Sequence, residues 1–369
     1  MKLTRVFLAK ILFDSAGEIW GALQKRVSPW FFLPPLVFRI RLTNRCNLSC
    51  HYCYVSESLN KKNPGDLSLQ EWERIIDQIP WYSIVDLTGG EPFLAPHFLE
   101  IINRLLDRNL KVSLITNGTV NKEDVLETLV VKKLRYFMVS IDGERDQHDK
   151  IRGAGSFDKS INTIKKIQKL KEKYGSSLPS IVCKVTLTDT NSGSLEQLSD
   201  YLLNDVQVNG ITFNLLFQNN ARNGIVDAED FYHDKFWSGN TASYGDNSPA
   251  KIHESLERIV RLFKGRITVR PEIKKQAWQG YMQKPSRFSP VNCSKYLSIV
   301  TMYQDGKLTP CDLSLDIGNI KDVDYNPGKV FQLQRFTKFK SLFEKHQRSI
   351  PGCAGCCLKT HECLNEKTT

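Results

Sequence analysis

Short runs of apolar and β-branched residues alternate with longer amphipathic runs from residue 36 onward. The short runs have the length and composition of strands, whereas the longer runs repeat apolar residues at the spacing of a helix. This alternation is typical of parallel strands joined by crossover helices. The predicted strands are Val37–Leu42, Ile84–Leu87, Val112–Ile115, Tyr136–Ile141, Ile181–Leu187 and Ile211–Phe217.

Amphipathic runs occupy the intervals after these strands. Six strand–helix units suit an incomplete barrel, so the predicted fold class is α/β with a partial (β/α)6 barrel. In such barrels the reactive groups come from the carboxyl ends of the strands. The predicted helices are Leu69–Ile79, His97–Asp107, Lys122–Val131, Phe157–Lys173, Leu195–Leu203 and Ile252–Phe263.

A second, smaller unit is predicted after the barrel. Residues 218–250 are rich in Asn, Gly, Ser and Asp and lack periodicity, which indicates a connecting or lid segment. The β-rich runs Ser298–Tyr303 and Lys307–Pro310 flank an Asp-Gly pair and predict a hairpin. The predicted organisation is a helical extension (1–35), the barrel (36–218), a linker with a helical segment (219–290) and a small cysteine-rich domain (291–369).

Residues 6–23 repeat apolar side chains at near-helical spacing with basic residues nearby. We expect this helix to pack against the barrel, and binding to a membrane surface is the alternative. The apolar stretch Trp30–Phe38 is short and is interrupted by two prolines. No transmembrane span is therefore predicted.

The bulk composition is that of an ordinary globular protein, with 41% hydrophobic and 25% charged residues. The net charge of +11 favours anionic partners. No dense basic run with interleaved aromatic residues occurs, so a nucleic-acid partner is not expected. The ten cysteines fall mainly in two clusters, which favours metal ligation in a reducing, cytoplasmic location over disulfides.

Three cysteines lie in one short loop after the first predicted strand: Cys46, Cys50 and Cys53. Three thiolates leave one iron of a 4Fe-4S cube without a protein ligand, and an open metal position can take a substrate or cofactor. A structural zinc site is the alternative, but its cysteines usually come as two separated pairs. Three cysteines also cannot pair among themselves as disulfides. The loop is therefore a candidate reaction centre.

Polar clusters also follow three further predicted strands, so the carboxyl edge of the sheet gathers them. Any one of them could be an ordinary turn, but their common position favours a site. They are Gly89-Gly90-Glu91, Thr116-Asn117-Gly118 and Ser140 with Asp142-Gly143.

The cysteine spacing, with aromatic Tyr52 before the last cysteine, resembles the signature loop of the radical S-adenosylmethionine (radical SAM) superfamily. The resemblance covers about residues 36–218. It implies a 4Fe-4S cluster whose open iron is chelated by SAM, and electron transfer that cleaves SAM to methionine and a 5′-deoxyadenosyl radical. Because the cluster must be strongly reducing, it also implies a ferredoxin or flavodoxin partner.

The same resemblance assigns roles to the polar clusters. Gly89, Gly90 and Glu91 resemble the element that meets the SAM amino group, with Glu91 as hydrogen-bond acceptor. Arg152 resembles the arginine that pairs with the SAM carboxylate. The residues that resemble the family's element near the SAM ribose are Ser140, Asp142 and, less clearly, Asn117.

The second cysteine group resembles the C-terminal SPASM extension or its shorter relative, twitch, which bind auxiliary iron–sulfur clusters. A full SPASM domain has seven cysteines in a different spacing, and six cannot ligate two cubes. The resemblance therefore implies one auxiliary 4Fe-4S cluster, and a zinc knuckle is the alternative. The expected ligands are Cys293, Cys311, Cys353 and Cys356, with Cys363 as substitute for one of them and Cys357 as the odd thiol.

Two further residues have separate interpretations. Asp312 follows Cys311 and occupies the place where SPASM-type sulfatase-maturing enzymes carry a carboxylate that removes a substrate proton, so it is the candidate catalytic base. Cys183 lies in an alternating run and is expected to be a buried apolar side chain.

These features favour an oxidoreductase or maturase that abstracts hydrogen from a peptide or small natural product and oxidises or cross-links it. Too few residues precede the barrel for a compact peptide-binding domain, so recognition by a separate protein is expected. Modification of tetrapyrrole side chains is a second enzymatic alternative. A non-catalytic iron–sulfur electron carrier is the alternative outside enzymes, and it predicts no SAM pocket.

Overall fold

The structure is a computed structural model of the whole chain. The residues that it describes are 16–17, 19–26, 32–53, 55–56, 58–61, 65–215, 249–271, 273, 278, 288–290, 293–310, 315–346 and 361–363. Several predicted site residues lie outside these ranges, namely Cys311, Asp312, Cys353, Cys356 and Cys357.

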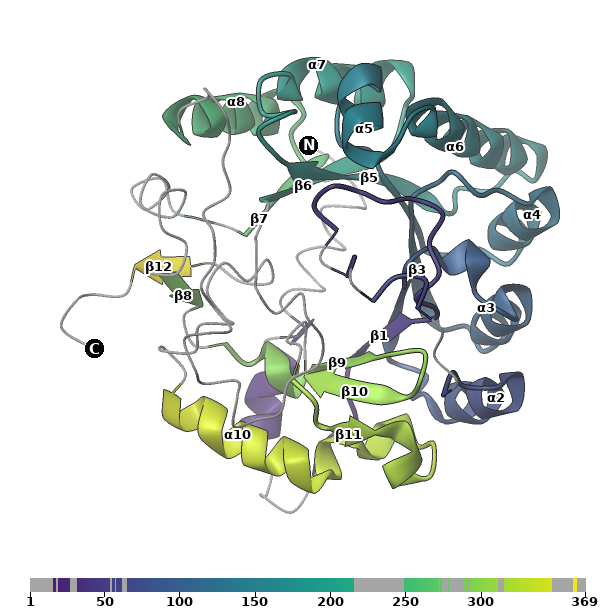
Figure 1. Cartoon of the computed structure of the whole chain (residues 1–369), viewed down its shortest axis with the longest axis vertical. Coiled ribbons are helices and arrows are strands. Elements are labelled where there is room, and N and C mark those ends of the chain that lie inside the picture. Colours follow the sequence, from purple (N-terminus) through teal and green to yellow (C-terminus); the bar gives the residue numbers. More distant parts are fainter. Residues whose placement is uncertain are drawn as a thin grey trace.

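One ten-stranded sheet forms the centre of the described molecule, in the order β11-β10-β9-β1-β2-β3-β4-β5-β6-β7. All neighbours from β1 to β7 are parallel, so the six predicted strands lie side by side in chain order and β7 extends them. The sheet curves into an incomplete barrel with helices outside (Figure 1). These strands are β1 (Val37–Arg41), β2 (Ile84–Thr88), β3 (Lys111–Thr116), β4 (Tyr136–Ser140), β5 (Ser180–Leu187), β6 (Gly210–Leu215) and β7 (Ile267–Arg270).

Amphipathic helices cover the outer face of the barrel, as their apolar spacing predicts. A capping box starts α2, where the Ser68 hydroxyl accepts from the backbone N–H of Glu71 and the Glu71 carboxylate accepts from that of Ser68. The α-helices are α2 (Leu69–Gln78), α3 (Phe98–Asp107), α4 (Glu123–Val131), α5 (Arg145–Arg152), α6 (Ser156–Lys173), α7 (Leu195–Asp200), α8 (Pro249–Leu262) and α10 (Gln334–His346).

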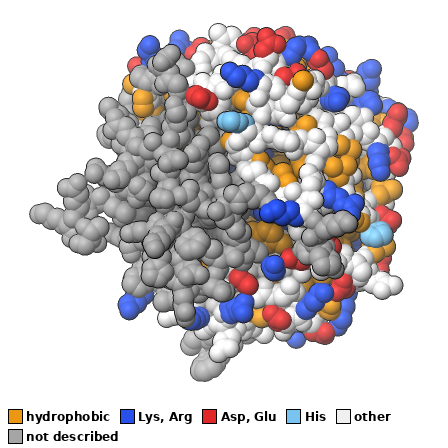
Figure 2. Space-filling model, viewed as in Figure 1, with side chains coloured by type: hydrophobic (Ala, Val, Ile, Leu, Met, Phe, Trp, Pro, Cys, Tyr) orange, Lys and Arg blue, Asp and Glu red, His pale blue; other side chains and the backbone are white. Residues whose placement is uncertain are grey.

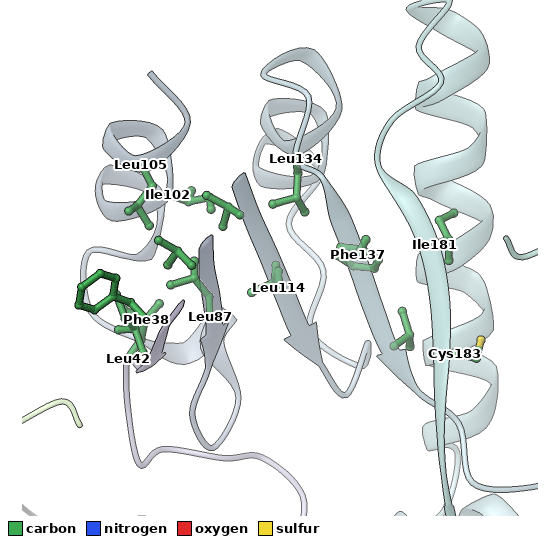
Figure 3. Packing of buried hydrophobic residues seen from close by; sticks show 14 of the residues in the cluster. Phe38, Leu42, Leu87, Ile102, Leu105, Leu114, Leu134, Phe137, Ile181 and Cys183 are labelled. Atoms are coloured by element: carbon green, nitrogen blue, oxygen red, sulfur yellow. The ribbon is translucent and has the colours of Figure 1, made fainter. Parts of the chain in front are cut away.

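The core lies between the helices and the outward-facing side chains of the strands. Figure 3 shows Leu87, Leu114 and Phe137, one from each of three successive strands, with Ile102 and Leu105 of α3 on the side of Leu87. Alternate strand residues point to the opposite face. The remaining strand positions therefore face the concave side of the barrel, and many of them are polar.

The predicted hairpin joins the main sheet. It consists of β9 (Ile299–Met302) and β10 (Lys307–Pro310), which pair antiparallel, and β11 (Gly318–Asn319) follows. Strand β9 pairs parallel with β1, so the chain after Cys293 continues the barrel sheet on the far side of β1. A separate pair is formed by β8 (Phe288–Pro290) and β12 (His361–Cys363).

Three local elements differ from the sequence expectation. Helix α5 and strand β7 were not predicted, because α5 is almost wholly polar and β7 has only four residues. The helix predicted to reach residue 203 is α-helical only as far as Asp200, and residues Tyr201–Asp205 form a π-helical turn. Short 3-10 helices are η1 (Pro92–Leu94), η8 (Lys295–Leu297), η9 (Ile320–Val323) and η10 (Pro327–Gln332).

The described part of the N-terminal segment is helical over residues 19–26. It packs on the amino end of the barrel: Trp20 contacts Tyr82 with the ring centres 5.3 Å apart and the planes tilted by 43°, and its indole N–H donates to the Pro34 carbonyl at 3.1 Å. Packing of this segment against the barrel is therefore confirmed for these residues. None of the helices in the described ranges is long and apolar enough to cross a bilayer.

Candidate active site at the carboxyl edge of the barrel

The cysteine loop leaves β1 and is fixed by hydrogen bonds at both ends. The side chain of Asn60 accepts from the Cys46 N–H and donates to the Cys46 carbonyl, both at 3.0 Å. At the other end, the His51 N–H donates to the Ile151 carbonyl at 3.1 Å, which ties the loop to α5. The three thiols are half-buried. The loop is thus held over the carboxyl ends of the strands.

Two glycines let the end of β2 touch the start of the cysteine loop. The N–H of Gly90 donates to the Thr43 carbonyl at 2.7 Å. A Cβ on Gly90 would lie 2.3 Å from the Arg45 carbonyl oxygen, and one on Gly89 would lie 2.6 Å from that of Thr43. Real Cβ atoms do not approach backbone so closely. Both glycines are therefore required by this backbone crossing, whatever they do for a ligand.

Glu91 is fully buried, and both of its carboxylate oxygens have protein donors. One oxygen accepts from the Thr116 hydroxyl at 2.7 Å and from the Phe93 N–H at 3.3 Å, and the other from the Asn117 N–H at 2.8 Å. Burial raises the pKa of Glu91 to about 7, although these donors oppose the rise. Glu91 therefore joins the end of β2 to the end of β3 by hydrogen bonds. Its contact with SAM stays a prediction.

Asn117 connects the end of β3 to the cysteine loop. Its side-chain N–H donates to the side-chain oxygen of Asn47 at 3.0 Å, and the side-chain N–H of Asn47 donates to the Thr119 hydroxyl at 2.8 Å. The Asn117 side-chain oxygen accepts from the N–H and hydroxyl of Thr119. These bonds fix the orientation of the loop segment between Cys46 and Cys50.

Asp142 and Arg152 form a buried ion pair after β4. The Arg152 Nε–H and the Tyr52 hydroxyl both donate to the same Asp142 oxygen, and Arg152 also donates to the Tyr52 oxygen at 2.8 Å. The other Asp142 oxygen accepts from the Thr186 N–H at 2.6 Å. Burial lowers the pKa of Arg152, but Asp142, Tyr52 and Cys50 together oppose burial and raise the pKa overall. The guanidinium is thus permanently charged.

The Arg152 guanidinium also lies 3.7 Å from the Cys50 sulfur. Burial raises the pKa of Cys50 to about 11, and Arg152 opposes this rise. Burial likewise raises the pKa of Cys46. The thiolate forms that iron requires therefore depend on the metal and on the nearby guanidinium for their stabilisation.

The donor set of the loop suits an iron–sulfur cluster. Three cysteines on one loop can each bind a different iron of a cube and leave the fourth iron open. Within the described ranges, no group of three or more His, Cys, Asp or Glu side chains is placed to hold a single metal ion. Ligation of a cluster by Cys46, Cys50 and Cys53 therefore stays a prediction.

His148, which was not predicted, is hydrogen-bonded to the backbone of Asp142 in the ion pair. Its Nδ1 accepts from the Asp142 N–H at 3.1 Å, so its proton is on Nε2, which is buried without a partner in the described structure. Burial lowers the pKa of His148 to about 4. The sequence signal that could have found it is its place four residues before Arg152, in the run His-Asp-Lys-Ile-Arg-Gly. Asn47, Asn60 and Thr116 were also missed as partners.

The remaining predicted residues are only partly placed. Ser140 ends β4, half-buried, next to Lys184 of β5 in register. Cys293 is buried, and the backbone of Cys363 pairs with Phe288, five residues before Cys293. Cys183 is fully buried, as predicted, and burial raises the pKa of its thiol above the usual range. The other predicted auxiliary ligands and Asp312 lie outside the described residues.

Comparison with known proteins finds a family model and relatives that are similar to the barrel. The Radical SAM superfamily model matches residues 40–187. Sporulation killing factor maturation protein SkfB of Bacillus subtilis is 31% identical over 173 residues, which are 46% of this chain and 40% of that protein. Antilisterial bacteriocin subtilosin biosynthesis protein AlbA of the same organism is 25% identical over 350 residues, covering 89% of this chain and 68% of AlbA.

A solved structure shares the fold. Streptococcus suis SuiB has a TM-score of 0.60 and 14% identity, covering 88% of this chain and 73% of SuiB. The match to SkfB spans less than half the length of that protein. The chain therefore matches the radical SAM superfamily over residues 40–187, and it shares the fold of SuiB.

Proposed function

We propose that the chain is a radical SAM enzyme that modifies a peptide. The observation that carries the proposal is the three-thiol loop, fixed at the carboxyl edge of the barrel with Arg152 beside Cys50. A 4Fe-4S cluster held by Cys46, Cys50 and Cys53 would supply the electron that cleaves bound SAM, and this chemistry would lead to removal of a hydrogen atom from the substrate.

The residues around the loop have distinct proposed roles toward SAM. Arg152 offers the permanent positive charge that a SAM carboxylate needs, and Ser140 lies at the end of the same strand–helix unit. Asp142 and Tyr52 hold the guanidinium in place. Gly89, Gly90, Glu91 and Asn117 hold the loop and the ends of β2 and β3 in a fixed relation, which keeps the binding edge ordered.

A peptide substrate is supported by the extent of the match to AlbA, which runs through 89% of this chain and so beyond the barrel. AlbA takes part in making the bacteriocin subtilosin, and SuiB has been solved with its precursor peptide SuiA. Tetrapyrrole modification stays an alternative, because matches confined to the barrel do not distinguish substrates.

An auxiliary cluster is part of the proposal. The β8–β12 pairing brings the backbone of Cys363 near the segment that leads to Cys293, which supports these two cysteines as ligands of one centre. Cys311, Cys353 and Cys356 are proposed to complete the ligand set, and Asp312 to take the substrate proton. A cytoplasmic location and a separate peptide-recognition protein belong to the same proposal.

The test is anaerobic reconstitution with iron and sulfide, followed by incubation with SAM and dithionite and measurement of 5′-deoxyadenosine. The wild-type chain should produce it, and Cys50→Ala should not. Cys183→Ala is the matched control, since it removes a thiol from the core and should retain the product. Absence of 5′-deoxyadenosine from a chain with about four irons per loop would disprove the proposal.

Substrate class needs a second measurement. A peptide encoded beside this chain should lose or exchange hydrogen in a SAM-dependent reaction, which mass spectrometry detects. A mass change in a porphyrin, with none in the peptide, would favour the tetrapyrrole alternative.

A further inference from the structure

The amino end of the barrel, where its parallel strands begin, carries exposed apolar side chains. Each crossover helix returns the chain to this end, so the last turns of the helices and the turns that follow them lie there. Within the described ranges, every exposed large apolar side chain has such a position or lies on the helix of residues 19–26. These side chains are Ile19, Leu23, Trp81, Val131, Tyr174, Val260 and Leu262. Their exposure is therefore confined to one end of the barrel.

Trp81 is the most exposed of these side chains, at 78%, and lies in the turn between α2 and β2. Its ring contacts that of Tyr82 edge-on with the centres 5.8 Å apart, and Tyr82 in turn contacts Trp20 of the N-terminal helix. No residue in the described ranges accepts a hydrogen bond from the Trp81 indole. A large aromatic ring with one free polar group is typical of the boundary between lipid and water.

The helix of residues 19–26 packs on the barrel by one face and exposes another. Gly21 lies so close to the barrel that a Cβ on it would be 2.4 Å from a backbone oxygen of the neighbouring segment. Ile19 and Leu23 lie one turn apart on the outer face and are 60% and 44% exposed. Lys25 and Arg26 are exposed beside them. An outer face that combines large apolar side chains with cations is typical of helices that bind a membrane surface.

Basic side chains also lie at the starts of the next two strands after Trp81. Lys111 is the first residue of β3 and pairs in register with Ile84 at the start of β2. Lys133 and Arg135 lie in the turn before β4. All three cations are exposed and form no ion pair with any residue that the structure describes. They are therefore available to an anionic partner.

Acidic side chains do not balance the cations in this part of the amino end. The acids near Trp81 and Lys133 are already held in ion pairs, which are Asp77–Arg104 and Asp107–Lys132. Glu172 and Asp205 form no ion pair within the described structure, but they precede β5 and β6, three or more strands along the sheet from β2. The end of the barrel around Trp81 therefore carries net positive charge.

The helix-covered side of the barrel is different. Figure 2 shows acidic and basic side chains interspersed along the edge where Figure 1 shows α2 to α6. Exposed ion pairs such as Arg145–Asp158 and Lys173–Glu127 form part of this mixture. The combination of exposed apolar side chains with unpaired cations therefore distinguishes the amino end.

We propose that the amino end of the barrel binds the surface of an anionic lipid membrane. Trp81, Ile19 and Leu23 enter the headgroup region, and the surrounding Lys and Arg side chains face the lipid phosphates. An anionic bilayer supplies both the apolar layer and the negative charge that this surface matches. The carboxyl edge with the cysteine loop then faces away from the bilayer and stays open to substrate. This inference goes beyond the proposed function and does not depend on it.

The test is sedimentation of the full chain with vesicles of phosphatidylcholine that contain about one-third phosphatidylserine. The wild type should sediment with these vesicles and bind pure phosphatidylcholine vesicles at least about tenfold more weakly. Lys111→Glu/Lys133→Glu should weaken binding to the anionic vesicles by about tenfold or more, because it reverses two charges at the surface. Trp81→Ser should weaken it as well. Its thermal unfolding should match the wild type, because Trp81 is largely exposed.

Lys122→Glu/Lys159→Glu is the matched control. It makes the same change in net charge at two exposed lysines near the starts of α4 and α6, which lie at the carboxyl end of the barrel. Binding of this variant to the anionic vesicles should equal that of the wild type. Equal weakening in the two charge variants would show a general effect of net charge and would overturn the proposal.

Two further outcomes would also overturn it. In the first, the wild type stays in the supernatant with the anionic vesicles. In the second, sedimentation equilibrium without lipid shows a dimer that Trp81→Ser dissociates, so that a second copy of the chain covers this surface. Failure to form 5′-deoxyadenosine would count against the proposed function alone, since vesicle binding needs neither the cluster nor SAM.

Discussion

Two carboxylates are completely buried beneath the cysteine loop, and they are held in opposite ways. Asp142 after β4 faces the guanidinium of Arg152, whereas Glu91 after β2 accepts hydrogen bonds from two backbone N–H groups and a hydroxyl. Glu91 has only neutral donors as direct partners, and its burial outweighs them and raises its pKa. The segment after β4, here called the strand-four region, is therefore held by an ion pair. The segment after β2, the strand-two region, is held by hydrogen bonds to Glu91, whose charge depends on pH.

The largest expected effect comes from removing the charge of Asp142. Asp142→Asn leaves Arg152 buried without its partner carboxylate, and breaking a buried pair in this way costs about 3–5 kcal/mol. The free energy of unfolding in urea should fall by that amount. Arg145→Ala breaks the exposed pair with Asp158 and should cost less than about 1 kcal/mol. Equal losses would show that burial does not distinguish the two pairs.

The next effect is a dependence of the free energy of unfolding on pH, which arises from His148. Its folded pKa of about 4 lies below the usual value of 6.5, so the unfolded chain binds the extra proton as pH falls through this window. The stability that neutral His148 contributes, about 3 kcal/mol, is present above pH 6.5 and is lost toward pH 4. His148→Asn retains an acceptor for the Asp142 N–H and should remove this dependence. The exposed His97→Asn should leave it intact.

Glu91 gives a slope of the opposite sign. Its folded pKa of about 7 exceeds the usual 4.5, so the unfolded chain loses its proton first as pH rises. The associated stability is complete below pH 4.5 and falls by about 3 kcal/mol by pH 7. Between pH 4.5 and 6.5 the two groups should nearly cancel. Glu91→Gln should therefore make stability rise with pH in this window, and His148→Asn should make it fall.

These slopes are read from urea unfolding at several pH values. Glu123→Gln, at an exposed helix start, is the control for Glu91. If Glu91→Gln and His148→Asn changed the pH dependence of the free energy of unfolding in the same direction, the proposed difference between the strand-two and strand-four regions would be contradicted.

A smaller effect sharpens the description of the strand-two region. Gly90→Ala puts a Cβ 2.3 Å from the Arg45 carbonyl oxygen, so the backbone must shift, at a cost of about 1–3 kcal/mol. Thermal unfolding measures the loss. Gly17→Ala meets only the Ser298 hydroxyl at 3.6 Å and should be neutral or slightly stabilising. A neutral Gly90→Ala would show that the crossing is not tight.

Local patterns were sufficient to predict the strand order and the edge at which the site lies. The alternation of strands and helices fixed the parallel order, and parallel strands bring their carboxyl ends together, so the cysteine loop, Gly90, Asn117 and Asp142 could be grouped in advance. Arg152 could be placed only through its resemblance to a family motif, because polar α5 has no apolar periodicity.

Pairings across the chain were not predictable from spacing. The bond from Asn117 to Asn47 spans 70 residues, and that from Asp142 to Thr186 spans 44. Which donor meets which acceptor depends on side-chain direction after folding. The same is true of Glu91: its sequence position suggested a ligand contact, but its burial among protein donors is a property of the folded edge.

The parallel pairing of β9 with β1 has a consequence for shortened forms of the protein. A polypeptide ending before residue 293 would leave β1 at the border of the sheet, with its backbone N–H and C=O groups exposed to other molecules. Such open borders recruit further strands. The isolated barrel should therefore self-associate, whereas in the whole chain residues 299–302 occupy this edge of β1.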